Sequence, residues 1–134
     1  AEVIAATQAR TYAPAADVTA ISVPTDQALE QGSSVTFGDV TVKVLTTGGH
    51  TPGASMFFYD DSFGYGHLFS GDCLFPGGIG KTANPQDFAT LFNAVKSQVF
   101  DVLPDTTWVY PGHGADTHVG MERGSLGEWG TRGW

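Results

Sequence analysis

Two histidines and one aspartate occupy similar positions in this sequence of 134 residues. His50, Asp72 and His113 each follow a short apolar run and stand in a turn that is rich in glycine. Side chains at strand ends are held by a rigid sheet, which favours ligand binding and catalysis there. Imidazole and carboxylate groups together suit zinc, iron or manganese. A lone loop histidine is more often a surface residue, so only the joint pattern predicts a metal site.

The apolar pattern predicts the strands that must hold these side chains in place. Alternating apolar residues on either side of Gly38 and Asp39 predict a hairpin of residues 34–37 and 40–45. Three further short apolar runs predict strands at residues 55–59, 65–70 and 107–110. Each of the three polar residues then follows one of the predicted strands.

One strong helix is predicted between Pro85 and Pro104, because prolines commonly flank helices. Apolar side chains recur at helical spacing over residues 88–103, so this face is expected to pack in the core rather than hold a cofactor. Weaker patterns predict short helices at residues 2–9 and 121–129 and loops at residues 14–24 and 76–85.

Composition limits the classes of protein to which the chain can belong. Hydrophobic residues make up 41% and charged residues 15%, which is typical of a folded chain rather than a disordered one. The net charge of −8 argues against nucleic acid as a partner, because phosphates require basic surfaces. No apolar stretch approaches the ~20 residues of a membrane span, so no membrane partner is expected. A lone Cys73 cannot form an internal disulfide, which favours a cytoplasmic location.

Three motifs around the candidate metal residues resemble those of a known family. Residues 49–53 read Gly-His-Thr-Pro-Gly, residues 71–75 read Gly-Asp-Cys-Leu-Phe, and residues 110–114 read Tyr-Pro-Gly-His-Gly. In this order they resemble the metallo-β-lactamase superfamily, and within it the glyoxalase II-like (hydroxyacylglutathione hydrolase-like) hydrolases. The resemblance implies an α/β fold, the four-layer αββα sandwich. Residues 1–134 would form a single incomplete domain, its C-terminal part.

The resemblance also implies a chemistry for the motif residues. His50 would bind a first metal ion, His113 a second, and Asp72 would bridge the two. Two divalent ions, zinc before iron or manganese, would hold a hydroxide that attacks the carbonyl of a small-molecule thioester. Lys81 would contact a carboxylate of the thiol carrier, although the simpler interpretation is a solvated lysine. No catalytic side chain beyond the metal ligands is implied.

The chain departs from the family at its signature motif. The sequence His-Xaa-His-Xaa-Asp-His, which supplies four ligating residues in the family, is absent. Residues 2–9 look like the helix that follows this motif, so the chain is expected to begin just after it. Each metal position would then keep one histidine and the shared carboxylate, fewer than the three protein ligands of a catalytic zinc. Weak or no metal binding, and no activity, are therefore predicted for this chain alone.

An incomplete sandwich also predicts an uncovered apolar sheet face, which would need a partner. That partner would be the missing N-terminal part or another copy of the chain.

Two other functions stay open. One is an iron-dependent persulfide dioxygenase, which would use His50 and Asp72 while His113 binds no metal. The other is a non-catalytic fragment or a degenerate interaction module.

Several other residues receive simpler interpretations. Cys73 is expected to be a buried small hydrophobe, His67 a structural residue and His118 an exposed one. Gly48 stands where the family usually has a proline before the Gly-His pair. Packing roles are expected for the tryptophans, which are Trp108, Trp129 and Trp134.

Overall fold

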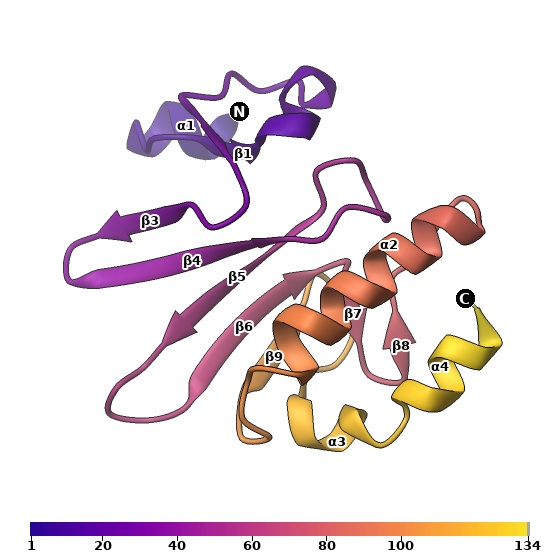
Figure 1. The fold of residues 1–134 in the computed structure, drawn as a ribbon. Coiled ribbons are helices and arrows are strands. Elements are labelled where there is room, and N and C mark those ends of the chain that lie inside the picture. The colour runs from indigo at the N-terminus through magenta and orange to yellow at the C-terminus, as the bar shows by residue number, and fades with distance from the viewer. Residues whose placement is uncertain (134) are drawn as a thin grey trace.

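A six-stranded sheet forms the centre of the molecule in the computed structural model, which describes residues 1–133 (Figure 1). Its strands, in spatial order, are β10 (Thr117–His118), β9 (Trp108–Pro111), β6 (Gly66–Gly71), β5 (Ser55–Asp60), β4 (Val40–Thr46) and β3 (Ser34–Phe37). Neighbouring strands are antiparallel except β6 and β9, which are parallel. The predicted strands are confirmed to within one residue at each end, whereas β10 was not predicted.

The helix α2 (Pro85–Val95) lies across one face of this sheet (Figure 1), and a π-helical turn, η2 (Lys96–Phe100), continues it. Its apolar side chains pack with the sheet in one buried cluster, so the predicted core role is confirmed. The helix begins earlier than its apolar stripe because Asn84 caps it, accepting a hydrogen bond from the backbone N–H of Asp87 at 2.9 Å. The main contributors to this core are Met56, Phe58, Leu68, Leu91, Val95, Val99 and Val109.

Besides the sheet strands and α2, the second half of the chain contains a small hairpin and two short helices. The hairpin pairs β7 (Leu74–Phe75) with β8 (Gly78–Ile79), inside and beside the segment predicted as loop. The prediction of one helix at residues 121–129 is wrong, because α3 (Val119–Arg123) and α4 (Leu126–Arg132) are separate. Trp129 of α4 is buried, which confirms its packing role. Trp134 lies outside the described residues.

The N-terminal segment forms α1 (Glu2–Thr7), β1 (Tyr12–Pro14), the 3₁₀-helix η1 (Ala15–Ala20) and β2 (Gln27–Leu29). The first helix ends before its predicted boundary because Gln8 adopts a left-handed conformation, with φ of 54°. The loop predicted at residues 14–24 is wrong over its first half, where η1 forms. β1 and β2 pair in parallel and join the parts of this segment before and after η1. No local sequence pattern predicted this pairing.

The face of the sheet opposite α2 is rich in aromatic side chains. Directly paired residues share a face of a sheet. The pairing of β5 with β6 and of β6 with β9 therefore brings their aromatic side chains together on one face. We define this aromatic face by Phe57, Tyr59, His67, Phe69, Trp108 and Tyr110. Phe69 and Trp108 are 47% and 40% exposed, so the packing role predicted for Trp108 is wrong in this chain.

The rings of the aromatic face stack on one another. His67 lies between Tyr59 and Tyr110, with centroid distances of 6.0 Å and 5.8 Å. The Nδ1 atom of His67 is also 2.9 Å from the hydroxyl oxygen of Tyr110, in agreement with the structural role predicted for this histidine. Within residues 1–133, no helix is long and apolar enough to cross a membrane.

Candidate metal site at the strand ends

The structure brings His50, Asp72 and His113 together at one edge of the six-stranded sheet. His50 lies in the loop after β4, Asp72 directly follows β6, and His113 follows β9. Asp72 Oδ2 is 3.5 Å from His50 Nε2, and Asp72 Oδ1 is 3.7 Å from His113 Nε2. Each carboxylate oxygen thus faces a different histidine. This arrangement is compatible with a carboxylate that bridges two cations.

Glycines allow the backbone to crowd around Asp72. A side chain at Gly112 would place its Cβ 2.6 Å from Asp72 Oδ1, and one at Gly80 would lie within 1.8 Å of the Asp72 carbonyl oxygen. Neither position can hold a larger residue without displacing the carboxylate or its backbone. The high glycine content around the motifs is therefore explained here by close packing.

His50 is held in one orientation by a backbone carbonyl. Its Nδ1 atom lies 2.7 Å from the carbonyl oxygen of Lys81, so Nδ1 carries the proton and donates it. Nε2, which faces Asp72, is then the free acceptor nitrogen that a metal ion requires. The predicted role of Lys81 concerned its side chain, whereas the contact seen here uses its backbone.

Asp17 supports the His50 loop, and sequence reasoning did not single it out. Its carboxylate accepts hydrogen bonds from the hydroxyl of Thr51 at 2.6 Å and from the backbone N–H of Gly53 at 2.9 Å. Asp17 lies in η1, more than thirty residues before the loop that it supports. An isolated aspartate in a segment predicted as loop gives no signal of such a contact.

His113 is the more open of the two histidines. Its side chain is 73% exposed, against 31% for His50 and 39% for Asp72. One face of its ring packs on Phe75 of β7, with a centroid distance of 4.8 Å and an interplanar angle of 39°. The β7–β8 hairpin therefore limits the orientations that this exposed side chain can adopt.

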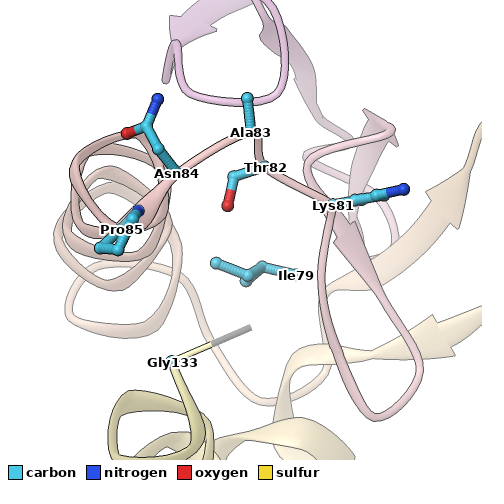
Figure 2. Close-up of a pocket in the computed structure, with 7 residues that line it drawn as sticks. All are labelled: Ile79, Lys81, Thr82, Ala83, Asn84, Pro85 and Gly133. Atoms are coloured by element: carbon cyan, nitrogen blue, oxygen red, sulfur yellow. The ribbon is translucent and has the colours of Figure 1, made fainter.

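Among the cavities near the three residues, two share lining residues with each other. The first, of about 250 Å³, contains the three residues and is lined by His50, Asp72, Phe75, Ile79, Gly80, Lys81 and His113. The second, of about 560 Å³, shares Ile79 and Lys81 with it and extends to the start of α2 and the end of α4 (Figure 2). In Figure 2 the Thr82 hydroxyl faces Ile79 across this space, while the Lys81 ammonium extends away from Asn84 and Pro85.

The donor types suit a divalent transition metal, but their number is too small. Only one histidine nitrogen and one oxygen of Asp72 converge on either side of the carboxylate. Among the described residues, no group of three or more His, Cys, Asp or Glu side chains is arranged to hold a metal ion. A catalytic zinc normally has three protein ligands. Residues 1–133 therefore do not form a complete metal site by themselves.

The remaining candidates lie away from this chemistry. Cys73 is 1% exposed, and burial raises the pKa of its thiol, so the predicted hydrophobic role is confirmed. Its Sγ atom is 3.3 Å from the hydroxyl of Thr47. The prediction that His118 is exposed is wrong, because its ring is half-buried against the edge of Trp108, at a centroid distance of 5.9 Å.

Solved structures define the class of protein. A metallo-β-lactamase from Staphylococcus aureus matches 93% of this chain with a TM-score of 0.79 and 25% identity, and the match spans 42% of that protein. The protein TTHA1623, solved in a di-iron-bound form, matches 90% of the chain with a TM-score of 0.71 and 28% identity, over 65% of its own length. The chain belongs to the metallo-β-lactamase superfamily and corresponds to a C-terminal portion of its αββα sandwich, as the motifs predicted.

Sequence relatives come from two branches of that superfamily. A hydroxyacylglutathione hydrolase (glyoxalase II) of Rhizobium etli is 41% identical over 96 residues, which are 70% of this chain and 35% of the relative. The human persulfide dioxygenase ETHE1 is 35% identical over 89 residues, or 66% of the chain and 34% of the relative. The chain thus spans about a third of the length of these two relatives. No family model matches the chain.

Proposed function

We propose that this chain is part of a metal-dependent thioester hydrolase of the glyoxalase II type. The observation that carries the proposal is the placement of Asp72 between two histidines, with one oxygen toward each. The similarity to a hydroxyacylglutathione hydrolase supports it. His50 and His113 would each hold one divalent ion, with zinc expected and iron or manganese as alternatives. When bound, the two metal ions would supply a hydroxide at neutral pH.

The substrate would occupy the two cavities that share Ile79 and Lys81. Its thioester carbonyl would lie in the smaller cavity beside Asp72, and its thiol carrier would extend into the larger one. Lys81 lines both, and its ammonium would pair with a carboxylate of the carrier after turning toward the larger cavity, from which it points away in Figure 2. The Phe75 ring beside His113 would exclude water from one side of the reacting group.

The chain alone is proposed to bind metal weakly and to be inactive. On each side of Asp72 it offers two donors, one histidine nitrogen and one carboxylate oxygen, whereas a catalytic zinc normally has three protein ligands. The remaining ligands would come from an N-terminal part that carries His-Xaa-His-Xaa-Asp-His. That part would cover the aromatic face, with another copy of this chain as the alternative partner. We place the assembled protein in the cytoplasm, because a single buried Cys73 needs no oxidising compartment.

Metal content and hydrolysis should be measured on the intact protein and on the 134-residue chain in parallel. We expect two equivalents of zinc and hydrolysis of a glutathione thioester for the intact protein, and neither for the chain. Asp72→Asn in the intact protein should lower metal affinity by at least ~10²-fold, since removing even an outer partner of a ligand costs 10- to 100-fold. A tightly held pair of metal ions in the chain alone would overturn this part of the proposal.

The second candidate is a persulfide dioxygenase with one iron, and the similarity to ETHE1 favours it. His113 separates the two candidates, because the dioxygenase would not use it as a ligand. His113→Ala should abolish thioester hydrolysis in a two-metal enzyme. In a one-iron enzyme the same variant should keep its iron and its oxygen consumption. An intact protein without metal or either activity would instead support the non-catalytic module.

A further inference from the structure

One small hairpin and the two residues directly after it contact all three residues of the candidate metal site. The Phe75 ring of β7 packs on the His113 ring at a centroid distance of 4.8 Å. Directly after β8, Gly80 packs on the Asp72 backbone so closely that a Cβ atom would clash with the carbonyl oxygen. The carbonyl oxygen of the next residue, Lys81, accepts a hydrogen bond from His50 Nδ1 at 2.7 Å. A shift of this segment would therefore disturb a contact to each of the three residues.

The tip of the hairpin has a turn that is defined by glycine. Pro76 and Gly77 connect the paired residues Phe75 and Gly78. Gly77 has a φ of +81°, the conformation that the third residue of a type II turn requires, and proline favours the position before it. The turn fixes the shape of the hairpin, but it does not fix where the hairpin lies relative to the sheet.

Two C-terminal helices hold the tip at a single residue. The backbone N–H of Gly77 donates to Oε2 of Glu122 in α3 at 2.9 Å. The carbonyl oxygen of Gly77 accepts from Nη2 of Arg132 in α4 at 3.1 Å. Both polar groups of one residue are thus bonded to side chains 45 and 55 positions later. We call this pair of contacts the Gly77 anchor.

Glu122 is a buried carboxylate that the metal site itself does not use. It is 7% exposed, and its second oxygen accepts the hydroxyl proton of Thr117 at 2.7 Å. A buried carboxylate destabilises a fold unless hydrogen bonds satisfy it. Here the two oxygens have one donor each, and the donors come from the hairpin tip and from β10. Glu122 therefore links the hairpin directly to the edge of the six-stranded sheet.

We propose that Glu122 and Arg132 are positioning residues that act on His50, Asp72 and His113 through the hairpin. The α3 and α4 helices hold the tip from behind, so that the Phe75 ring and the Lys81 carbonyl stay against the two histidines. The catalytic consequence rests on the proposed function, whereas the mechanical consequence does not. The segment that contacts the metal site is thereby connected to the last two helices of the chain.

The first arm of the test measures the hairpin itself. Glu122→Met keeps the side-chain length but removes both acceptors, so hydrogen exchange of segment 74–80 in the intact protein should accelerate about tenfold. Glu122→Gln keeps an acceptor for Gly77 and should restore slow exchange. Arg132→Met removes the other half of the anchor at a partly exposed site, and it serves if Glu122→Met fails to fold.

Arg123→Met is the matched control. Arg123 holds the same helix α3 through Asp105 and the carbonyl oxygens of Phe100 and Leu103, and it does not contact the hairpin. This variant should lower the free energy of unfolding without selective exchange in segment 74–80. Should every variant accelerate exchange there only in proportion to its loss of global stability, the Gly77 anchor would have no positioning role.

The second arm measures kcat, KM and metal content of the intact protein. Glu122→Met should lower kcat about tenfold with metal content retained, and Glu122→Gln should recover most of it. Selective exchange in the first arm together with a wild type that hydrolyses no thioester would reject the proposed function and keep the anchor. An active wild type whose kcat is unchanged by Glu122→Met and by Arg132→Met would reject the catalytic role of the anchor.

Discussion

At the scale of single residues, the site depends on hydrogen bonds that hold ligands from outside. The carbonyl oxygen of Lys81 selects the tautomer of His50, and Asp17 fixes the loop that carries this histidine. In proteins that bind metal ions, such contacts orient a histidine ligand through its second nitrogen. Their donors and acceptors lie far away in the sequence, so the residues that bear the chemistry are only part of what the site needs.

Asp17→Ala tests the support of the His50 loop. The substitution removes two hydrogen bonds to a carboxylate, those from Thr51 and Gly53, so the free energy of unfolding should fall by about 1–3 kcal/mol. Urea denaturation followed by circular dichroism measures the loss. Asp39→Ala, at an exposed aspartate in the β3–β4 turn, is the control and should change stability by less than ~0.5 kcal/mol. Equal effects of the two substitutions would contradict the supporting role.

The Cys73 thiol tests the effect of burial on pKa. Burial raises the thiol pKa, so the folded state keeps the neutral form to a higher pH than the unfolded state does. The stability linked to this group is therefore present below the unfolded pKa and is lost as the pH rises above it. At pH 8 we expect alkylation by iodoacetamide to be at least ~10²-fold slower in the native chain than in urea. A native rate within a few-fold of the unfolded rate would show that Cys73 is accessible.

At the scale of elements, α2 stabilises the sheet face whose strand ends carry the site. Its buried stripe packs on β5, β6 and β9, and the loops that bear Asp72 and His113 begin where β6 and β9 end. The hairpin β7–β8 then closes the site from the other side. Helix packing and hairpin contacts together convert strand ends into a fixed cavity.

Leu91→Ala tests the contribution of α2. Leu91 is fully buried, so the substitution should lower the free energy of unfolding by about 2–5 kcal/mol through lost burial and a residual cavity. Asn93→Ala on the exposed side of the same helix is the matched control and should cost less than ~0.5 kcal/mol. Chemical denaturation would measure both losses of unfolding free energy, provided that the dependence of this free energy on denaturant concentration is the same in each variant. A loss below ~1 kcal/mol for Leu91→Ala would mean that α2 packs loosely.

At the scale of the whole molecule, the chain presents one covered and one uncovered side of its sheet. The covered side carries the core under α2, whereas the aromatic face includes side chains that are 40% and 47% exposed. A contiguous aromatic surface of this kind is typical of an interface rather than of a solvated face. The incomplete donor set and the aromatic face both support our proposal that an N-terminal part of the protein packs here.

Phe69→Asp tests this view of the assembled protein. A charge at the centre of the aromatic face should weaken association with the separately produced N-terminal part at least ~10-fold, because an unpaired charge would be buried in the complex. Phe63→Asp is the matched control, since Phe63 is 100% exposed in the turn after β5 and lies off the aromatic face. Titration calorimetry measures both affinities. Equal affinities for the two variants would place the interface elsewhere.

The sequence by itself determined the elements and motifs whose signals are local. Alternating or continuous apolar residues located five strands of the six-stranded sheet to within one residue, and helical spacing located the stripe of α2. The three motifs identified the superfamily, because each one combines a candidate metal ligand with neighbouring glycines, of which Gly49, Gly53 and Gly112 are packed too closely to carry a side chain. Periodicity and turn chemistry act over a few residues, so they can be recognised without knowing what the chain contacts elsewhere.

Only the tertiary structure decided the contacts between distant segments. It placed one oxygen of Asp72 toward each histidine, paired β1 with β2, and divided the C-terminal segment into two helices that hold Gly77. It also left Trp108 partly exposed, although a packing role was predicted, and it half-buried the His118 side chain, which was predicted to be exposed. These features depend on which segments meet after the sheet forms, and a hydrogen bond across 45 positions has no periodic signature. Long-range packing therefore set the geometry of a site whose residue types were already visible in the sequence.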